Sequence, residues 1–537
     1  AVYYAHAGAG ELHLRPLIDL KSESDRIKLR QICEASAQLV KKYKGSLSGE
    51  HGDGRVRAEF IPLMVGESNY NRFKRVKQIW DPNGIFNPGK IVDAPPMDED
   101  LRYEVETEEA AIDSFLDFSD NQGLLQAVEK CNGSADCRKI TGAMCPTYQA
   151  TKNEKTTTRA RANILREVLT ENSKSTLPLA DEGLKEVLDL CVSCKACKRE
   201  CPSNVDMSLM KAEFLYQYNE KNGISLKDKI IANLPELNKR SIPISRLVNF
   251  AMNNSLTARF IKQFLGVHSK RNLPPLNSIS FEKWLIQTKP LTRNPYKTVY
   301  LFIDEFTNFN DLEIGQITVS LLFRMGYEVL WVSNAFSGRT YISKGHLQKA
   351  KDVAEKNVEV YRDLITPETP LIGIEPSAIL TFRDEYPKLL EGKAKKEAQN
   401  IATNTFTIEE FIFNQSKERD LKQFFHEDEK KVKAHVHCHQ KALSDKSMTA
   451  SILSIPKNYS CTIVNGGCCG MAGSFGYEKD KFELSKQMAE LHLIPTVNNA
   501  SSDTIIAASG TSCRHQIDDL STRTALHPIE VLYNALK

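Results

Sequence analysis

The sequence contains no apolar run that approaches the roughly 20 residues needed to cross a bilayer, which argues against an integral membrane protein. It also has little excess charge, since 71 basic and 68 acidic residues leave a net charge of +3. That balance argues against a protein dedicated to nucleic acid. No secretory signal peptide is visible. The chain begins not with methionine but with Ala-Val-Tyr-Tyr-Ala-His, typical of the middle of a β-strand, so we expect an N-terminal part of a larger protein to be missing.

The composition is that of a soluble globular protein, with 41% hydrophobic and 26% charged residues among 537. A chain of this length predicts roughly three or four domains. Its 13 cysteines are grouped rather than scattered. Grouped cysteines favour metal ligation in a reducing compartment over secreted disulfides.

The densest cysteine group is Cys191-Val-Ser-Cys194-Lys-Ala-Cys197-Lys-Arg-Glu-Cys201-Pro202. The C-x2-C-x2-C-x3-C-P spacing is typical of iron–sulfur ligation, in which the fourth cysteine serves a second cluster. A disulfide staple and a zinc knuckle are the alternatives. The run therefore predicts that electrons pass through this protein.

A second, degenerate group has Ser134 where the spacing expects its middle cysteine. If each group lends its last cysteine to the other, one cluster has four thiolates and the second has three. The second site would then be a [3Fe–4S] centre, a cube with a serine or solvent ligand, or absent. The predicted ligands are Cys145, Cys191, Cys194 and Cys197 for the first cluster, and Cys131, Cys137 and Cys201 for the second.

Two short strands joined by a glycine-containing turn are predicted at the N-terminus, over residues 2–6 and around Leu12 and Leu14. This hairpin brings His6 near His13, which suggests a metal or anion site. A helix is predicted over residues 25–44. Its predicted buried stripe comprises Leu29, Ile32, Cys33, Ser36, Leu39, Val40 and Tyr43, with Cys33 serving as core packing.

Two further motifs follow, Ser48-Gly49-Glu50-His51-Gly52 and Asp81-Pro-Asn-Gly-Ile-Phe-Asn-Pro-Gly-Lys90. Together with His6-x6-His13 they resemble the C-terminal cap domain of FAD-linked 2-hydroxyacid dehydrogenases, over residues 1–93. The resemblance implies a divalent metal (Zn, Mn or Fe), a catalytic base and flavin contacts. The implied residues are His6, His13 and Glu50 as metal ligands, His51 as base, and Gly52, Asn87 and Gly89 on the flavin side.

One departure from that family concerns the hairpin turn, where Gly8-Ala9-Gly10-Glu11 replaces the common Gly-Asp-Gly-Asn. Because this Asp is absent, the identity of the substrate stays open. The domain that holds the FAD dinucleotide is not among these 537 residues.

Proline and acidic residues mark a linker over residues 94–125, in which residues 104–109 read as a solvated acidic face. The basic segment 158–166 is either another solvated face or charge compensation for the clusters. Apolar periodicity predicts helices within residues 204–216 and 226–264.

From residue 297, strands alternate with helices, which predicts a parallel sheet. Ligands bind outside the carboxyl ends of such strands, and three of the loops expected there carry cysteine. The predicted strands are 299–303, 329–332, 371–374, 434–436, 462–464 and 504–508, and the loop cysteines are Cys438, Cys468, Cys469 and Cys513. Four unrelated buried cysteines are the alternative, and Cys461 is interpreted as packing.

An internal repeat relates residues 334–338 to 467–470 and residues 375–378 to 510–513, with every cysteine lost from the first copy. The pattern resembles the Cys-rich CCG domain of heterodisulfide reductase and of glycolate oxidase iron–sulfur subunits, which implies a cluster or another metal. The usual C-x2-C ending is absent, because His515 and Gln516 follow. The cluster type therefore stays open.

We expect a multidomain α/β protein: an α+β flavin-oxidase cap fragment (1–93), a linker (94–125), an α-helical ferredoxin-like domain (126–215), a helical connector (216–296) and a parallel α/β CCG repeat (297–537). The order resembles FAD-linked D-lactate, glycolate or D-2-hydroxyglutarate dehydrogenases fused to iron–sulfur modules. This implies oxidation of a 2-hydroxyacid, with FAD and one or two 4Fe-4S clusters, a quinone or redox-protein acceptor, and a cytoplasmic location with peripheral membrane contact left open. The alternatives are a non-catalytic electron-transfer subunit and disulfide reduction at the CCG site.

Overall fold

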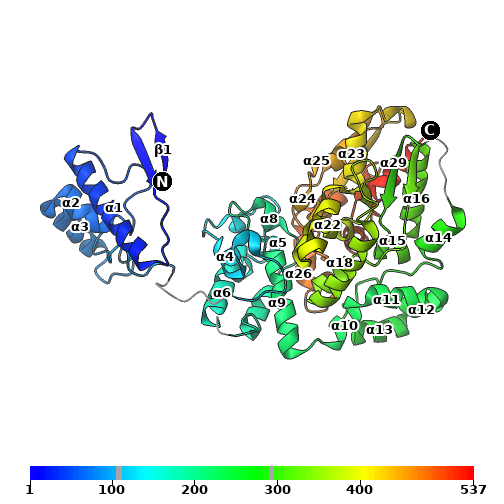
Figure 1. The fold of residues 1–537 in the computed structure, drawn as a ribbon, viewed down its shortest axis with the longest axis horizontal. Helices are drawn as coiled ribbons and strands as arrows, with labels where there is room; N and C mark the ends of the chain where they lie inside the picture. Colours follow the sequence, from blue (N-terminus) through cyan, green and yellow to red (C-terminus); the bar gives the residue numbers. More distant parts are fainter. Residues whose placement is uncertain (104–111, 173–174, 290–294) are drawn as a thin grey trace. The chain divides into compact units, whose positions relative to one another are not determined.

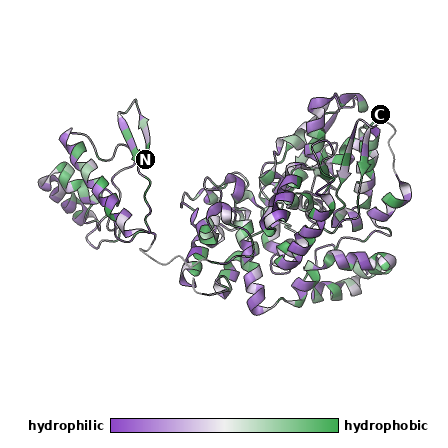
Figure 2. Ribbon diagram, in the orientation of Figure 1, coloured by the Kyte–Doolittle hydropathy of each residue, from purple (hydrophilic) through white to green (hydrophobic). Residues whose placement is uncertain are grey.

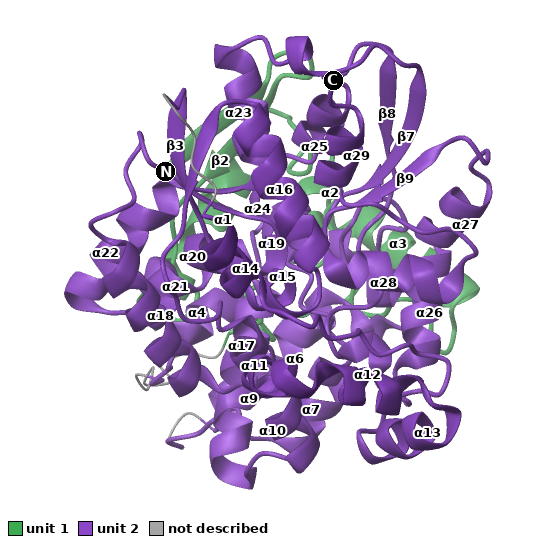
Figure 3. Ribbon diagram, turned by 90° about the vertical axis from the view of Figure 1, so that its right-hand side faces the viewer, with its two compact units in different colours: residues 1–110 green, residues 111–537 purple. Residues whose placement is uncertain are grey.

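The computed structural model describes residues 1–103, 112–172, 175–289 and 295–537 (Figure 1). The chain divides into two compact units, residues 1–110 and 111–537 (Figure 3). The predicted acidic face at residues 104–109 lies outside the described residues. Within the described ranges, no helix has the length and apolar character that a bilayer span requires.

The first unit opens with the predicted hairpin, an antiparallel pair in which His6 stands opposite Glu11 and Tyr4 opposite His13. Side chains alternate between the two faces of a strand, so this register places the two histidines on one face. The elements of the unit are β1 (Val2–His6), β2 (Glu11–Arg15), α1 (Glu23–Lys42), η1 (Ala58–Phe60), α2 (Ile61–Val65) and α3 (Glu67–Trp80).

The core of this unit is small. It consists of Ala37, Phe60 and Met97, against which Leu29 and Cys33 pack. The predicted buried stripe of α1 is therefore wrong in part, because Leu39 is 56% and Tyr43 74% exposed. The helix has the expected period, but the second half of its apolar face is only partly covered: Ala37 is buried and Val40 half-buried, whereas Leu39 and Tyr43 are exposed.

Short helices form the start of the second unit. Their caps come from the sequence: the Thr157 hydroxyl accepts from Ala160 N at 2.9 Å, and the Asp206 carboxylate accepts from Leu209 N at 3.1 Å. The helices are α4 (Leu124–Glu129), α5 (Pro146–Thr151), α6 (Thr158–Glu171), α7 (Glu182–Asp189), α8 (Ala196–Glu200) and α9 (Met207–Asn222).

The basic segment 158–166 lies on α6 and is not wholly a solvated face, because Arg161 is buried. Its guanidinium donates to Val187 O at 3.2 Å. The Arg161 charge also opposes the rise in the pKa of Cys145 that burial causes. Charge compensation for a buried thiol is the better description of this residue.

The connector is helical, as predicted, but broken. Pro235 lies at the start of α11 and Pro243 at the start of a 3-10 turn, where the missing N–H of proline leaves no hydrogen bond unmade. The segments are α10 (Leu226–Ala232), α11 (Leu234–Ser241), η5 (Ile242–Ile244), α12 (Ser245–Asn253), α13 (Ser255–Phe264) and α14 (Phe281–Thr288).

The remaining residues form two parallel sheets rather than one, in the orders β4-β3-β5-β6 and β8-β7-β9. The shared order β4-β3-β5 and β8-β7-β9 agrees with the internal repeat. The strand β6 was not predicted, because its sequence Thr-Phe-Thr contains no apolar run. The strands are β3 (Lys297–Leu301), β4 (Tyr327–Leu330), β5 (Leu371–Gly373), β6 (Thr405–Thr407), β7 (Lys430–His435), β8 (Tyr459–Ile463) and β9 (Ile505–Ala508).

Helices cover both sheets, and apolar residues of the strands and helices form shared cores in which Val299, Ile372 and Ala434 are buried. Cys461 on β8 packs against this core, as interpreted from sequence. The helices are α15 (Glu305–Phe309), α16 (Leu312–Arg324), α17 (Arg339–Ser343), α18 (Leu347–Tyr361), α19 (Pro376–Ile379), α20 (Thr381–Asp384), α21 (Tyr386–Leu389), α22 (Gly392–Thr403), α23 (Ile408–Glu418), α24 (Cys438–Leu443), α25 (Ser447–Leu453), α26 (Phe482–Glu490), α27 (Leu493–Asn498), α28 (Thr511–Leu520) and α29 (Pro528–Asn534).

Candidate metal and electron-transfer sites

The hairpin of the first unit brings two imidazoles together with a carboxylate. The His6 and His13 rings lie 4.9 Å apart between centroids. Glu50 reaches them from the loop after α1, with its Oε1 at 3.3 Å from His6 Nε2 and 3.5 Å from His13 Nε2. The neighbouring His51 places its Nε2 3.0 Å from the same oxygen. Two imidazoles and a carboxylate are ligands suited to Zn, Mn or Fe.

Sequence reasoning missed Glu11 as a member of this group. Glu11 offers a carboxylate oxygen within 4.8 Å of the donor atoms of His6, His13 and Glu50. Its side chain lies over Gly49, where an added Cβ would stand 2.7 Å from Glu11 Cδ. The hairpin register was the available signal, because it pairs Glu11 directly with His6.

The residues predicted on the flavin side lie on two separate loops. Asp81 orders the later loop, since its carboxylate accepts from Ile85 N at 2.7 Å and Phe86 N at 2.9 Å and pairs with Lys77 at 2.6 Å. Asn87 follows with a φ of 51°. No hydrogen bond or ion pair of the described residues joins Asn87, Gly89 or Gly52 to His6 or His13.

In the second unit, the three cysteines predicted for the second cluster line one pocket. Cys131, Cys137 and Cys201 face it together with Ser134, the residue at the vacant ligand position. Thr158 and Arg159 of α6 complete the wall. The fold therefore brings together Cys137 and Cys201, which are more than 60 residues apart in the chain.

The four cysteines predicted for the first cluster are neighbours as well. Burial raises the pKa of Cys197, and the nearby thiols of Cys191 and Cys145 raise it further. Burial raises the pKa of Cys145 to about 11, although its Sγ accepts a hydrogen bond from Thr158 N at 3.1 Å. Buried thiols with raised pKa values lose their protons when a metal binds them.

The C-terminal thiols converge at the carboxyl edge of the β8-β7-β9 sheet. Cys438 follows β7, Cys468 and Cys469 follow β8, and Cys513 follows β9. A hydrogen bond with the Cys468 thiol lowers the pKa of Cys438 to about 6, and hydrogen bonds from Cys468 and Cys513 lower the pKa of Cys469. The edge thus holds closely packed sulfur ligands.

A fifth residue, His435, completes this group and was not predicted. One of its ring nitrogens lies within 4.8 Å of the sulfurs of Cys469 and Cys513. The ring is buried, and neither nitrogen has a hydrogen-bond partner among the described residues. Burial lowers the pKa of His435 to about 3, which leaves the ring neutral and able to bind a metal ion. A buried imidazole without partners is costly unless a ligand occupies its lone pair.

The cysteines of the first cluster and those of the C-terminal group lie next to each other. Cys194 lines the same pocket as Cys438 and Cys468, and the Cys438 thiol, after burial, is the largest contributor to the raised pKa of Cys194. His439 Nε2 lies 3.1 Å from Ser193 O. The loop of Gly467 also packs closely against Ala143, where an added Cβ at Gly467 would stand 2.7 Å from Ala143 O.

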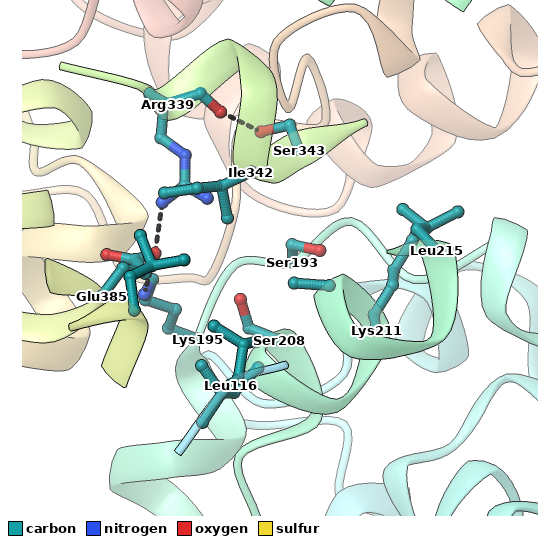
Figure 4. A pocket seen from close by; sticks show the side chains of 13 residues that line it. Leu116, Ser193, Lys195, Ser208, Lys211, Leu215, Arg339, Ile342, Ser343 and Glu385 are labelled. Atoms are coloured by element: carbon teal, nitrogen blue, oxygen red, sulfur yellow. Dashed lines mark hydrogen bonds and ion pairs between the residues drawn. The ribbon is translucent and has the colours of Figure 1, made fainter. Parts of the chain in front are cut away.

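Buried charges fix the cluster loop against the α/β region. Lys195, between Cys194 and Cys197, pairs with Asp384 and, at 2.6 Å, with Glu385. Arg339 pairs with the same Glu385 oxygen. Figure 4 shows Lys195 and Arg339 converging on Glu385. Together, the contacts make the first-cluster group a neighbour of both other groups: Cys145 lies near Cys137, and Cys194 lies with Cys438 and Cys468.

Comparison with known proteins finds two family models that match separate parts of the chain. Residues 1–91 match the family described as FAD linked oxidases, C-terminal domain, and residues 127–205 match the 4Fe-4S dicluster domain. These matches imply FAD and iron–sulfur clusters as cofactors. No solved structure matches the chain.

Among curated proteins, the chain is 26% identical to D-2-hydroxyglutarate dehydrogenase of Pantoea ananatis, over 98% of this chain and 55% of the relative. It is 25% identical to the Escherichia coli protein of the same name, over 99% and 56%. It is also 25% identical to one subunit of the anaerobic glycerol-3-phosphate dehydrogenase of Escherichia coli, over 58% and 78%.

The chain spans about half the length of the D-2-hydroxyglutarate dehydrogenases it matches. It carries a C-terminal domain of FAD-linked oxidases followed by a 4Fe-4S dicluster domain, and along nearly its whole length it is similar to D-2-hydroxyglutarate dehydrogenases.

Proposed function

We propose that this chain takes part in the FAD-dependent oxidation of a D-2-hydroxyacid, such as lactate, glycolate or 2-hydroxyglutarate, to the 2-oxoacid. The observation that carries the proposal is the convergence of His6, His13, Glu50 and His51 in the oxidase domain. The similarity to D-2-hydroxyglutarate dehydrogenases supports 2-hydroxyglutarate as the first substrate to test.

In this proposal, His6, His13 and Glu50 would hold a divalent cation, which would supply Lewis acidity and so lower the pKa of a substrate hydroxyl. His51 takes the hydroxyl proton at a ring nitrogen, and Glu50 Oε1, 3.0 Å from His51 Nε2, orients the ring. FAD, when bound, supplies the hydride acceptor. Gly52, Asn87 and Gly89 are assigned to the flavin side by family resemblance.

The thiol groups of the second unit would carry the electrons away. Iron–sulfur clusters held by Cys145, Cys191, Cys194 and Cys197, and by Cys131, Cys137 and Cys201, supply one-electron carriers. Because Cys194 lines one pocket with Cys438 and Cys468, electrons would pass next to the C-terminal group. That group, Cys438, Cys468, Cys469 and Cys513 with His435, would hold a further metal or cluster. The final acceptor is a quinone or a redox protein.

The experiment measures metal and activity together. A His51→Gln variant should keep the divalent metal but lose about 10²- to 10⁴-fold in oxidation of D-2-hydroxyglutarate with a dye acceptor. A His6→Ala variant should lose the divalent metal itself. Retention of full activity by His51→Gln would overturn the role of base, and a metal content unchanged in His6→Ala would overturn the metal site.

The similarity to a subunit of glycerol-3-phosphate dehydrogenase favours a second candidate, a non-catalytic electron-transfer protein. On that view the clusters are present, but no 2-hydroxyacid reduces them. Electron paramagnetic resonance of anaerobic protein that holds bound FAD, before and after addition of D-2-hydroxyglutarate, separates the two. Reduction of the clusters by substrate supports the dehydrogenase, and reduction by dithionite alone supports the electron-transfer protein.

A further inference from the structure

The helices α12 and α13 expose apolar side chains to solvent. Leu247 and Phe250 on α12, and Leu256, Phe260 and Phe264 on α13, are between 65% and 73% exposed. The spacing of the α13 residues, at i, i+4 and i+8, puts them on one face of that helix. The two helices pack against each other as a hairpin (Figure 1), and Figure 2 shows apolar residues along both.

This apolar surface lies in a segment without acidic residues. Between Glu236 and Glu282 the sequence contains no Asp or Glu, whereas its basic residues are Lys239, Arg240, Arg246, Arg259, Lys262, Lys270 and Arg271. In the described structure, Arg271 is the one of these that is fully buried and ion-paired, 3.1 Å from Asp519. Arg246 and Arg259 are exposed beside Leu247 and Phe260, and neither forms an ion pair with a described residue.

The segment directly after the hairpin, residues 266–271, is bound to the α/β region. His268 N donates to Tyr477 O at 2.8 Å, and Lys479 N donates to Gly266 O at 2.9 Å. The Arg271 guanidinium donates to Gly476 O at 2.7 Å, and the His268 ring stacks on Phe482 at 3.8 Å between centroids. The hairpin therefore leads directly into a segment that is fixed to the α/β region.

We propose that the α12–α13 hairpin docks the protein on the surface of a membrane that contains anionic lipids. Aromatic and leucine side chains on one face, with Lys and Arg alongside, are the features of helices that lie in the interface without crossing the bilayer. The absence of acidic residues favours anionic lipid over a protein partner, whose surface carries both signs of charge. The proposal is independent of the oxidised substrate.

The test uses the full chain and sedimentation with vesicles of phosphatidylcholine, with or without phosphatidylglycerol. The wild type should bind the vesicles containing phosphatidylglycerol at least about tenfold more tightly than those without it, and added salt should weaken that binding. A Phe260→Ser, Phe264→Ser double variant should bind about tenfold or more weakly. An Arg246→Glu, Arg259→Glu variant should lose the preference for phosphatidylglycerol.

Matched controls separate the hairpin from the rest of the surface. Phe323→Ser changes an exposed Phe on α16, and Lys393→Glu with Lys396→Glu makes the same change in charge on α22. These variants should bind vesicles as the wild type does. Equal binding by wild type and both hairpin variants would overturn the proposal. Concentration-dependent self-association lost in Phe260→Ser, Phe264→Ser, without vesicle binding by the wild type, would also overturn it and assign the surface to a second copy of the chain.

Discussion

At the scale of single residues, a few side chains change the chemistry expected of each site. His435 adds a neutral nitrogen donor to a group otherwise composed of thiols. Glu11 adds a second carboxylate to the histidine site of the hairpin. Ser134 stands in the pocket of Cys131, Cys137 and Cys201, where a fourth thiol would complete the ligand set.

Replacing His435 tests whether its nitrogen reaches the metal. We expect His435→Ala to remove a nitrogen hyperfine coupling from the pulsed paramagnetic resonance spectrum of the C-terminal centre, and to lower its metal content. His439→Gln serves as the control, because His439 contacts Ser193 O instead of the thiols. An unchanged nitrogen coupling in His435→Ala would exclude ligation.

Gly49→Ala should weaken the divalent metal site by about 10- to 100-fold, because the new Cβ displaces the Glu11 carboxylate. Titration with Mn²⁺ against a competing chelator measures the change. Gly8→Ala alters the same hairpin where an added Cβ meets nothing within 4 Å, and it should bind as the wild type does. Equal affinities of the two variants would remove Glu11 from the site.

Ser134→Cys should convert the second centre of the dicluster region to a complete four-thiolate site. The expected result is one more iron per chain, together with loss of any [3Fe–4S] signal in the oxidised protein. Iron analysis and paramagnetic resonance measure both. If the iron content and spectra match the wild type, position 134 lies outside the coordination sphere.

At the scale of elements, the first half of the α/β repeat carries buried acidic side chains after its strands, where the second half carries its thiols. One of them, Glu375, binds α28 of the second half. Glu305 follows β3 and accepts from Ser337 N at 2.9 Å, and Glu375 follows β5 and accepts from Thr511 N at 2.8 Å. On α23, Glu409 is fully buried, and burial raises its pKa to about 7. The first half has therefore kept the loop positions but uses carboxylates to fix them.

Glu409 makes the stability depend on pH. The native carboxyl keeps its proton after the unfolded one, with a pKa near 4.5, has lost it. The free energy of unfolding should therefore fall as pH rises from about 4.5 to about 7, by roughly 3 kcal/mol at most. Glu409→Gln should make this fall smaller than in the wild type, as measured by urea unfolding at several pH values, while buried Asp304, whose pKa burial raises to about 7, keeps its own share. Parallel pH profiles for both proteins would contradict the prediction.

At the scale of the whole molecule, the two units differ in what stabilises them. The cores of the second unit contain the cysteines of all three thiol groups, whereas the core of the first unit consists of Ala37, Phe60 and Met97. Metal binding should therefore contribute to the stability of the second unit far more than to that of the first.

Removal of iron with a chelator under reducing conditions should lower the unfolding temperature of the second unit by at least about 5 °C. The unfolding temperature of the first unit should change little. Differential scanning calorimetry of untreated and iron-depleted protein measures both. Coincident, unshifted transitions would show that iron does not stabilise the second unit.

Much of the fold could be predicted because local patterns carry it. The hairpin and most α/β strands follow from alternating or continuous apolar runs, and the grouped cysteines follow from spacing alone. The exposed half of α1 could not be predicted, since periodicity shows which residues share a face but not whether anything covers it. The strand β6 could not be predicted either, because Thr-Phe-Thr lacks the apolar run that marks the equally short β5.

The sequence by itself determined which residues are suited to chemistry here, because ligand spacing and glycine-flanked motifs are local properties of the chain. Only the tertiary structure decided which of them meet. Glu11 joins the histidines through strand register, His435 joins Cys469 and Cys513 through the order of parallel strands, and Cys194 meets Cys438 through packing between helices α8 and α24. The contacts of His435 and Cys194 join residues far apart in the chain, and long-range packing, which leaves no local pattern, brings them together. Glu11 is the local case, because the hairpin register pairs it with His6.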